Sequence, residues 1–290
     1  MKYDCAGINV TESAARLANS GDFELQLQPV IKPDERRLIS AEAIVGSFDP
    51  ERLQEHGITV DEMACLVKHR ALGRDFDLQV LDKALAAVQR LKRNHGIELP
   101  VSINLGVDSV LNPDFPGRAW RTLERAGIES HFVQFEVSEI TLSSEADAKA
   151  GVFRLLDSGF AVIIDEFIAG DSDFGALVSL PVRTIKIDPS VSYELTRFET
   201  ARRFMRALSM LAQSMGKQLV ADGVDNYQQF MFLQAIGCGY LQGRYLTAPL
   251  ETHKVADFAR RFMLSNASDR FAENRTGVRG LNAGDDRREK

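Results

Sequence analysis

The chain has 290 residues, of which 44% are hydrophobic and 26% are charged, as in ordinary soluble globular proteins. This composition excludes a disordered, collagen-like or small disulfide-rich protein. The chain is long enough to form a large hydrophobic core that needs no disulfide bonds for stability. The net charge of −6 argues against a surface built to coat nucleic acid. The three cysteines are an odd number without a CxxC pair, so we expect reduced thiols.

The two ends of the chain differ in character from its middle. The first residues lead into no apolar leader segment, and no apolar run approaches the roughly 18 residues that span a bilayer. We therefore expect a cytoplasmic protein without membrane contact. Residues 1–22 are predicted to be a short helical lead-in, and 265–290 a disordered tail, because apolar periodicity is lost there. Residues 23–264 remain as one domain without an internal linker.

Strand-like runs alternate with helical segments through this domain. Strands are predicted at 23–30, 38–45, 99–105, 132–137, 160–164, 182–187, 218–221 and 239–242. Helices are predicted at 60–93 with a break near Gly73, and at 145–156, 200–215 and 226–236. Such alternation indicates βαβ units and a parallel sheet. About eight units fit an α/β fold of the closed TIM (β/α)₈ type, for which about 250 residues are typical. An open, doubly wound sheet is the alternative.

Seven predicted strands carry a polar side chain at or near their carboxyl end. A charged group there is costly in a sheet that is buried on both faces. In barrels and open α/β sheets, however, this end of the strands is where sites are built. The sequence therefore predicts one site formed by Glu42, Asn104, Glu136, Asp165 with Glu166, Lys186, Asp222 and Gln242.

These residue types favour a hard divalent cation. Carboxylates with an amide oxygen, and no histidine or cysteine at ligand spacing, suit Mg²⁺ or Mn²⁺ rather than Zn²⁺. Several carboxylates converging with one lysine also suit two-metal hydrolysis of a phosphodiester, in which one aspartate bridges both ions and the lysine orients the attacking water. A glycosidase needs only two carboxylates, so the pattern has too many for that chemistry.

Seven short motifs around these residues occur in the order found in a known family. They are AEAI at 41–44, SINL at 102–105, FEVSE at 135–139, DEFI at 165–168, LPV at 180–182 with KID at 186–188, DGVD at 222–225, and QG at 242–243 with Pro249. Over about residues 23–262 the chain resembles the EAL domain, the cyclic-di-GMP phosphodiesterase family. The resemblance implies a modified (β/α)₈ barrel.

The resemblance also implies a role for each site residue. Lys186 would assist the hydrolytic water, Glu139 would anchor the loop after Asp165, and Asp225 would stand near the reacting centre. The metal ligands would be Glu42, Asn104, Glu136, Asp165, Glu166 and Asp222, and Asp165 would bridge the two ions. Contacts to cyclic-di-GMP would come from Glu42, Gln242 and Pro249.

Among the positions that depart from the family pattern, four bear most on activity. Glu166 replaces an aspartate and Asp222 a glutamate, so two carboxylates are displaced by one methylene each. Misplacement by about 1 Å can cost on the order of a hundredfold in rate. Gly46 stands where the family has an arginine that contacts the nucleotide. Ile168 replaces a loop glycine, and since a β-branched residue disfavours positive φ, we expect a rebuilt loop.

These departures leave three hypotheses. The first is a regulatory EAL protein with a degenerate site, which represses genes such as virulence or motility genes through a protein partner and retains at most residual cyclic-di-GMP binding. The alternative is an active phosphodiesterase that uses Mg²⁺ or Mn²⁺ to open cyclic-di-GMP to the linear dinucleotide, since every carboxylate position still holds a carboxylate. Direct DNA binding is the least favoured because of the acidic balance. A homodimer is compatible with all three.

Overall fold

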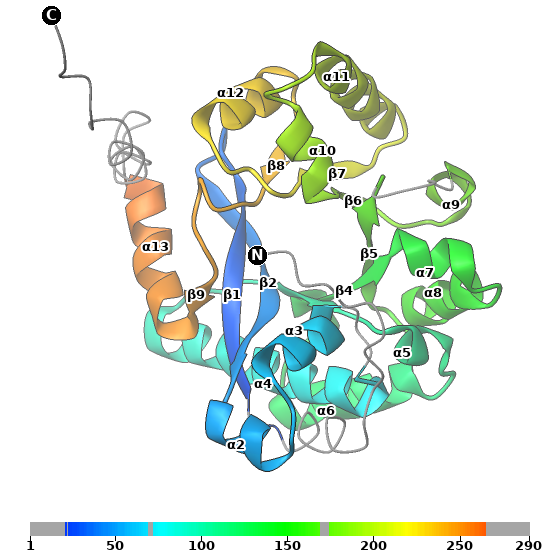
Figure 1. The fold of residues 1–290 in the computed structure, drawn as a ribbon, viewed down its shortest axis with the longest axis vertical. Coiled ribbons are helices and arrows are strands. Elements are labelled where there is room, and N and C mark those ends of the chain that lie inside the picture. Colours follow the sequence, from blue (N-terminus) through cyan, green and yellow to red (C-terminus); the bar gives the residue numbers. More distant parts are fainter. Residues whose placement is uncertain (1–20, 22, 69–71, 169–173, 265–290) are drawn as a thin grey trace, which may run out of the picture.

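The computed structural model describes residue 21 and residues 23–68, 72–168 and 174–264 (Figure 1). The predicted tail and all of the predicted lead-in except Gly21 lie outside the described residues, as does most of the loop after Ile168. The proposed domain limits of 23 and 264 therefore stay a prediction. Within the described residues, none of the helices combines the length and the apolar character that a membrane crossing requires.

The strands form one sheet that closes on itself. Its order is β2-β3-β4-β5-β6-β7-β8-β1-β9, and β1 pairs with β2 as well, which completes a barrel. The predicted barrel is thus confirmed, and the open sheet is wrong. The strands are β1 (Phe23–Lys32), β2 (Arg37–Phe48), β3 (Val101–Asn104), β4 (Val133–Ser138), β5 (Ala161–Phe167), β6 (Thr184–Ile187), β7 (Gln218–Ala221), β8 (Tyr240–Leu241) and β9 (Leu250–Glu251).

The direction of β1 departs from the predicted parallel sheet. β1 runs antiparallel to β2, β8 and β9, whereas the pairs from β2 to β8 are parallel. The cause is the short connection at 33–36, because a parallel partner would need a crossover of about a dozen residues or more. Pro33 and Asp34 start this turn, and Arg36 closes it at φ 53°.

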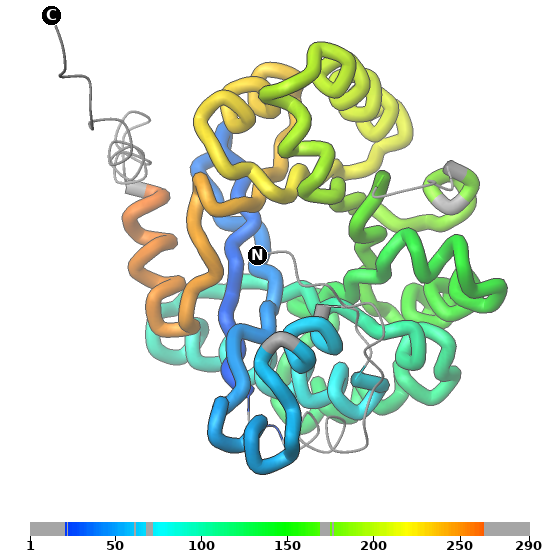
Figure 2. The backbone as a smooth tube through the Cα atoms, in the orientation of Figure 1, coloured from blue at the N-terminus to red at the C-terminus, as the bar shows by residue number. Residues whose placement is uncertain are grey.

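Helices surround the strands on the outside of the barrel, as Figures 1 and 2 show. The predicted break near Gly73 is confirmed, since Gly73 has φ 82° and a new helix begins after it. The same helix ends at Gly96, which adopts the left-handed conformation. The helices are α2 (Pro50–Glu55), α3 (Val60–Lys68), α4 (Arg74–His95), α5 (Val107–Leu111), α6 (Phe115–Ala126), η1 (Ser130–Phe132), α7 (Glu139–Ser144), α8 (Ala148–Asp157), α9 (Phe174–Ser179), α10 (Pro189–Glu194), α11 (Glu199–Ser214), α12 (Tyr227–Ala235) and α13 (Thr252–Leu264).

The main core lies between the strands and these helices. On β4, Phe135 is fully buried, and its ring lies 5.6 Å from that of Phe115 on α6 and 5.0 Å from that of Phe160. Successive strand residues point to opposite faces, so Glu136 points away from this layer and into the barrel. The alternation that builds the core therefore also aims the polar residues at a common interior.

The cysteines are not all reduced thiols, contrary to the prediction. Cys238 is free and buried beside β7 and β8, where burial raises the pKa of its thiol to about 12. Cys65 on α3 is disulfide-bonded. An odd number of cysteines leaves room for one pair and one free thiol, which the count alone did not reveal.

Candidate functional site

Parallel pairing brings the predicted polar residues to one end of the barrel. Glu42 lies on β2 opposite Ser102 of β3, and Asn104 lies opposite Glu136 of β4. The remaining members come from the next strands or directly follow them: Asp165 on β5, Lys186 on β6, Asp222 after β7 and Gln242 after β8. Because each strand contributes at its carboxyl end, residues up to 200 positions apart become neighbours.

Lys186 lies at the centre of this group. Its Nζ donates to Oε2 of Glu42 at 2.5 Å and to Oε2 of Glu136 at 3.2 Å. Asp222 Oδ2 lies 3.7 Å away and Asp165 Oδ1 lies 4.0 Å away. The lysine side chain is only 4% exposed, so these carboxylates replace water around the ammonium. We call Lys186 and these four carboxylates the Lys186 cluster.

Two amides fix the carboxylate of Glu42 within the cluster. Asn104 Nδ2 donates to Glu42 Oε1 at 2.8 Å, and Gln242 Nε2 donates to Oε2 at 2.8 Å. Gln242 Nε2 also approaches Oε1 of Gln28 at 3.2 Å, and Gln28 in turn donates to the carbonyl of Thr247. Sequence reasoning missed Gln28. Its only signal was a polar residue in the alternating first strand, and the antiparallel pairing places it directly opposite Glu42.

The cluster carries more negative than positive charge. Burial raises the pKa of Glu136 to about 8, with Glu42 and Asp165 adding to the effect and Lys186 opposing it. Burial likewise raises the pKa of Asp222 to about 6. Burial alone lowers the pKa of Lys186, but the surrounding carboxylates raise it well above its usual value. Lys186 is therefore a fixed cation, and the carboxylates still lack compensating charge.

The carboxylate of Glu166 makes no hydrogen bond or ion pair with the Lys186 cluster among the described residues. Its Oε2 accepts a hydrogen bond from Ser138 Oγ on β4 at 2.8 Å, and its backbone N–H donates to Oδ1 of Asp165. Its φ of 55° and the register shift between Ile164 and Phe167 mark a local departure from strand geometry. The structure thus brings together the other predicted metal-ligand residues and leaves Glu166 held by Ser138.

The loop after β5 begins differently from the prediction. Ile168 has φ 70°, so the β-branched residue does adopt the left-handed conformation that we expected it to avoid. Its N–H donates to Oε2 of the buried Glu139 at 3.0 Å, and this bond helps to hold the unfavourable backbone. Glu139 therefore contacts the start of this loop. Residues 169–173 lie outside the described part of the chain.

Asp225 and Pro249 are also separate from the Lys186 cluster in the described contacts. Asp225 forms a two-point ion pair with Arg244, with Nη2 at 2.6 Å from Oδ2 and Nε at 3.1 Å from Oδ1. Its N–H donates to Gln229, which belongs to the capping box of α12. Pro249 lies directly before β9, which pairs with β1. Asp225 is thus engaged in holding together the loops after β7 and β8.

The donor set fits a hard cation in its chemistry. Carboxylate oxygens of Glu42, Glu136, Asp165 and Asp222, with the amide of Asn104, are the ligand types that Mg²⁺ and Mn²⁺ prefer. Burial, with the neighbouring carboxylates, raises the pKa values of Glu136 and Asp222, and a bound cation would stabilise the charged forms of both groups. In the described residues, however, no three such groups are spaced to hold a metal ion. Binding one requires the carboxylates to exchange contacts with Lys186 for contacts with the ion.

The comparisons with known proteins agree with this architecture. The EAL domain model matches residues 11–249, so the chain belongs to the EAL domain family, and the resemblance seen in the sequence is confirmed. A relative in Pseudomonas aeruginosa, the cyclic di-GMP phosphodiesterase PA2567, is 27% identical over 253 residues. The match covers 87% of this chain but 42% of that protein, so the chain spans less than half of the relative's length.

Solved structures share the fold. The EAL domain of Mycobacterium smegmatis DcpA has a TM-score of 0.69 at 24% identity, covering 84% of this chain and 100% of that one. Klebsiella pneumoniae BlrP1, solved with manganese and cyclic-di-GMP at pH 6, has a TM-score of 0.67 at 24% identity, covering 80% and 56%. This likeness identifies the modified TIM barrel predicted from the sequence.

Proposed function

We propose that this chain is a regulatory EAL domain of the cyclic-di-GMP network whose hydrolytic site is impaired. In this proposal it controls gene expression, as a repressor of genes such as virulence or motility genes, through contact with a protein partner. The position of Glu166 carries the proposal, because its carboxylate is hydrogen bonded to Ser138 instead of joining the Lys186 cluster. A site for two metal ions would therefore lack one of its expected ligands.

Asp222 supports the same interpretation. Its shortened side chain reaches Lys186 only at 3.7 Å, and its other oxygen accepts the N–H of Gly223 at 2.6 Å. Any metal ligand role for Asp222 therefore competes with this local hydrogen bond. Both substituted carboxylates thus make contacts of their own, and this supports the proposal that the two one-methylene changes do not compensate each other.

Nucleotide binding is expected to be weak but not absent. Gly46 provides no guanidinium for a phosphate, and the side chain of Gln26 fills the adjacent space. Lys186 keeps its positive charge, and Gln242 has a buried Oε1 without a hydrogen-bond partner among the described residues. These groups would orient a water or a phosphate oxygen. A bound Mg²⁺ or Mn²⁺ would supply Lewis-acid activation of the phosphodiester and of water.

An active phosphodiesterase is the second candidate. The observation that favours it is the convergence of Glu42, Glu136, Asp165 and Asp222 on Lys186, which keeps most of the expected donor set at one end of the barrel. The two candidates differ in whether regulation needs hydrolysis. That difference can be tested in cells as well as with the purified protein.

The test compares a strain lacking the chain after complementation with wild type or Lys186→Met. Lys186→Met removes the cation of the site, so it abolishes hydrolysis in either case. If regulation acts through protein contacts, the variant restores the expression profile as wild type does, provided that immunoblots show equal amounts of both. Restoration by wild type alone, with equal amounts of both proteins and matching circular dichroism spectra of the purified chains, would contradict the proposal and favour the phosphodiesterase. Calorimetry with cyclic-di-GMP on both purified proteins would show whether the ligand binds.

A further inference from the structure

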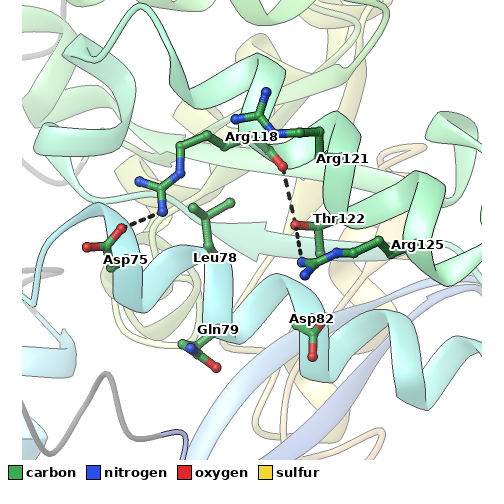
Figure 3. Close-up of a pocket in the computed structure, with 8 residues that line it drawn as sticks. All are labelled: Asp75, Leu78, Gln79, Asp82, Arg118, Arg121, Thr122 and Arg125. Atoms are coloured by element: carbon green, nitrogen blue, oxygen red, sulfur yellow. Dashed lines mark hydrogen bonds and ion pairs between the residues drawn. The ribbon is translucent and has the colours of Figure 1, made fainter.

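A second polar hollow lies on the outside of the barrel between α4 and α6. Its volume is about 620 Å³, and Figure 3 shows Arg118 of α6 reaching across it to Asp75 of α4. Its charged lining consists of Asp75 and Asp82 from α4 and of Arg118, Arg121 and Arg125 from α6. We call it the α4–α6 groove. It shares no residue with the Lys186 cluster.

The three arginines follow from helical spacing. Arg118, Arg121 and Arg125 are three and four residues apart, so they lie on one face of α6. Like charges at this spacing destabilise a helix unless they are compensated. Arg118 is compensated, since its Nη2 lies 2.7 Å from Oδ1 of Asp75. Arg121 makes no hydrogen bond or ion pair among the described residues, and Arg125 pairs with no carboxylate there.

Arg125 is nevertheless held in place. Its Nη2 donates to Oγ1 of Thr122 at 3.2 Å, and the Thr122 hydroxyl donates to the carbonyl of Arg118 at 3.2 Å (Figure 3). Thr122 is buried, with 4% of its surface exposed, so this support is fixed by packing. A guanidinium that is already ordered loses less entropy when it binds a ligand. The remaining N–H groups of Arg125 make no hydrogen bond among the described residues.

We propose that the α4–α6 groove binds a phosphate-bearing ligand through Arg121 and Arg125. A phosphoryl group carries about two negative charges at neutral pH, which matches two guanidinium groups that pair with no carboxylate in the described part of the chain. The planar guanidinium also donates two parallel hydrogen bonds to phosphate oxygens. Asp82 lines the same groove without an ion pair to either arginine among the described residues, so it repels the ligand and limits its affinity. Inorganic phosphate and a phosphomonoester share this chemistry.

The experiment titrates the full chain by calorimetry with inorganic phosphate and, separately, with guanosine 5′-monophosphate at constant ionic strength. We expect saturable binding of at least one of them. The double variant Arg121→Gln with Arg125→Gln is expected to weaken it by roughly tenfold or more, as for the loss of charge-assisted hydrogen bonds. Asp82→Asn is expected to tighten it several-fold. Arg203→Gln on α11 is the matched control, since that side chain is 76% exposed and lies outside the groove.

Each arm distinguishes the proposal from its alternatives. Binding of phosphate alone identifies the free ion as the ligand, and binding of the nucleotide identifies a phosphomonoester; either supports the site. The proposal is overturned by an absence of binding at about 10 mM, well above a Kd of 1 mM. Equal weakening by Arg203→Gln overturns it too, because that outcome means nonspecific attraction. Binding of poly-glutamate without either phosphate ligand would overturn it in favour of an acidic protein partner. Unchanged melting temperatures confirm that the variants fold.

Discussion

Lys186 Nζ and Glu42 Oε2 lie 2.5 Å apart although 144 residues separate them in the chain, and both side chains are buried. This ion pair ties β6 to β2 across the interior of the barrel. Three further carboxylates surround the same ammonium, so Lys186 neutralises charge for the whole cluster. Removing it would leave several buried carboxylates without a cation.

Lys186→Met is therefore expected to destabilise the metal-free chain. Breaking a buried ion pair by removing one partner costs about 3–5 kcal/mol, because the remaining charges stay buried. The free energy of unfolding, measured by urea denaturation in the presence of a chelator, checks this. Glu42→Gln in the same chain is expected to recover part of the loss. A loss below about 1 kcal/mol, the range of exposed pairs, would contradict the central position of Lys186.

The double variant Glu166→Asp with Asp222→Glu is expected to raise Mn²⁺-dependent cleavage of cyclic-di-GMP. The shortened side chain at position 166 would no longer reach the hydroxyl of Ser138, and the lengthened side chain at position 222 would extend further into the cluster. A correction of about 1 Å is worth up to roughly a hundredfold in rate. Product formation followed by chromatography measures it. No gain in the double variant would place the defect at Gly46 or in the loop after Ile168.

Gly46→Arg is expected to tighten cyclic-di-GMP binding by roughly tenfold, since a charge-assisted hydrogen bond contributes about 1.5–3 kcal/mol. A Cβ at position 46 would lie 3.0 Å from Cγ of Gln26, and this flexible side chain can move. Calorimetry of Gly46→Arg against Gly46→Ala separates the guanidinium from the effect of the added Cβ. If both variants bind alike, the arginine does not reach a phosphate.

The buried thiol of Cys238 makes the free energy of unfolding depend on pH in a way that does not involve the Lys186 cluster. Burial raises the pKa of its thiol from 9.0 to about 12, so above pH 9 the unfolded chain loses this proton while the folded chain keeps it. The unfolded state then binds fewer protons, and stability falls as the pH rises from about 9 to about 12, by up to about 1.4 kcal/mol per unit. Cys238→Ala is expected to remove this contribution. If urea denaturation shows that the free energies of unfolding of wild type and Cys238→Ala change in parallel with pH, the prediction is wrong.

The strand ends were predictable because polar residues interrupt apolar runs there. Asn104, Glu136 and Lys186 were found in this way, and parallel pairing then placed them together. The direction of β1 was not predicted from the alternation of residues, since a period of two is the same in either direction. Gln28 was missed for that reason, although it faces Glu42.

Side-chain direction at the substituted positions was beyond sequence reasoning. Asp165 and Glu166 are adjacent, and adjacent strand residues point to opposite faces, so both reach one site only where the backbone departs from a strand. Such a departure exists at Glu166, with φ 55°, yet its carboxylate accepts a hydrogen bond from Ser138 and does not reach the Lys186 cluster. Asp225 was assigned near the reacting centre, but Arg244, which no motif singled out, engages it. These outcomes depend on local hydrogen bonds that pattern and spacing do not encode.

The turnover of cyclic-di-GMP by the purified chain with saturating Mn²⁺ tests the impaired site most directly. With Glu166 bound to Ser138, we expect the rate of linear dinucleotide formation to stay far below ordinary enzyme values. An active cyclic-di-GMP phosphodiesterase in the same assay shows that the substrate and the metal are competent. Turnover of the wild-type chain on the order of 1 s⁻¹ or faster would contradict the account, because that is the range of working enzymes.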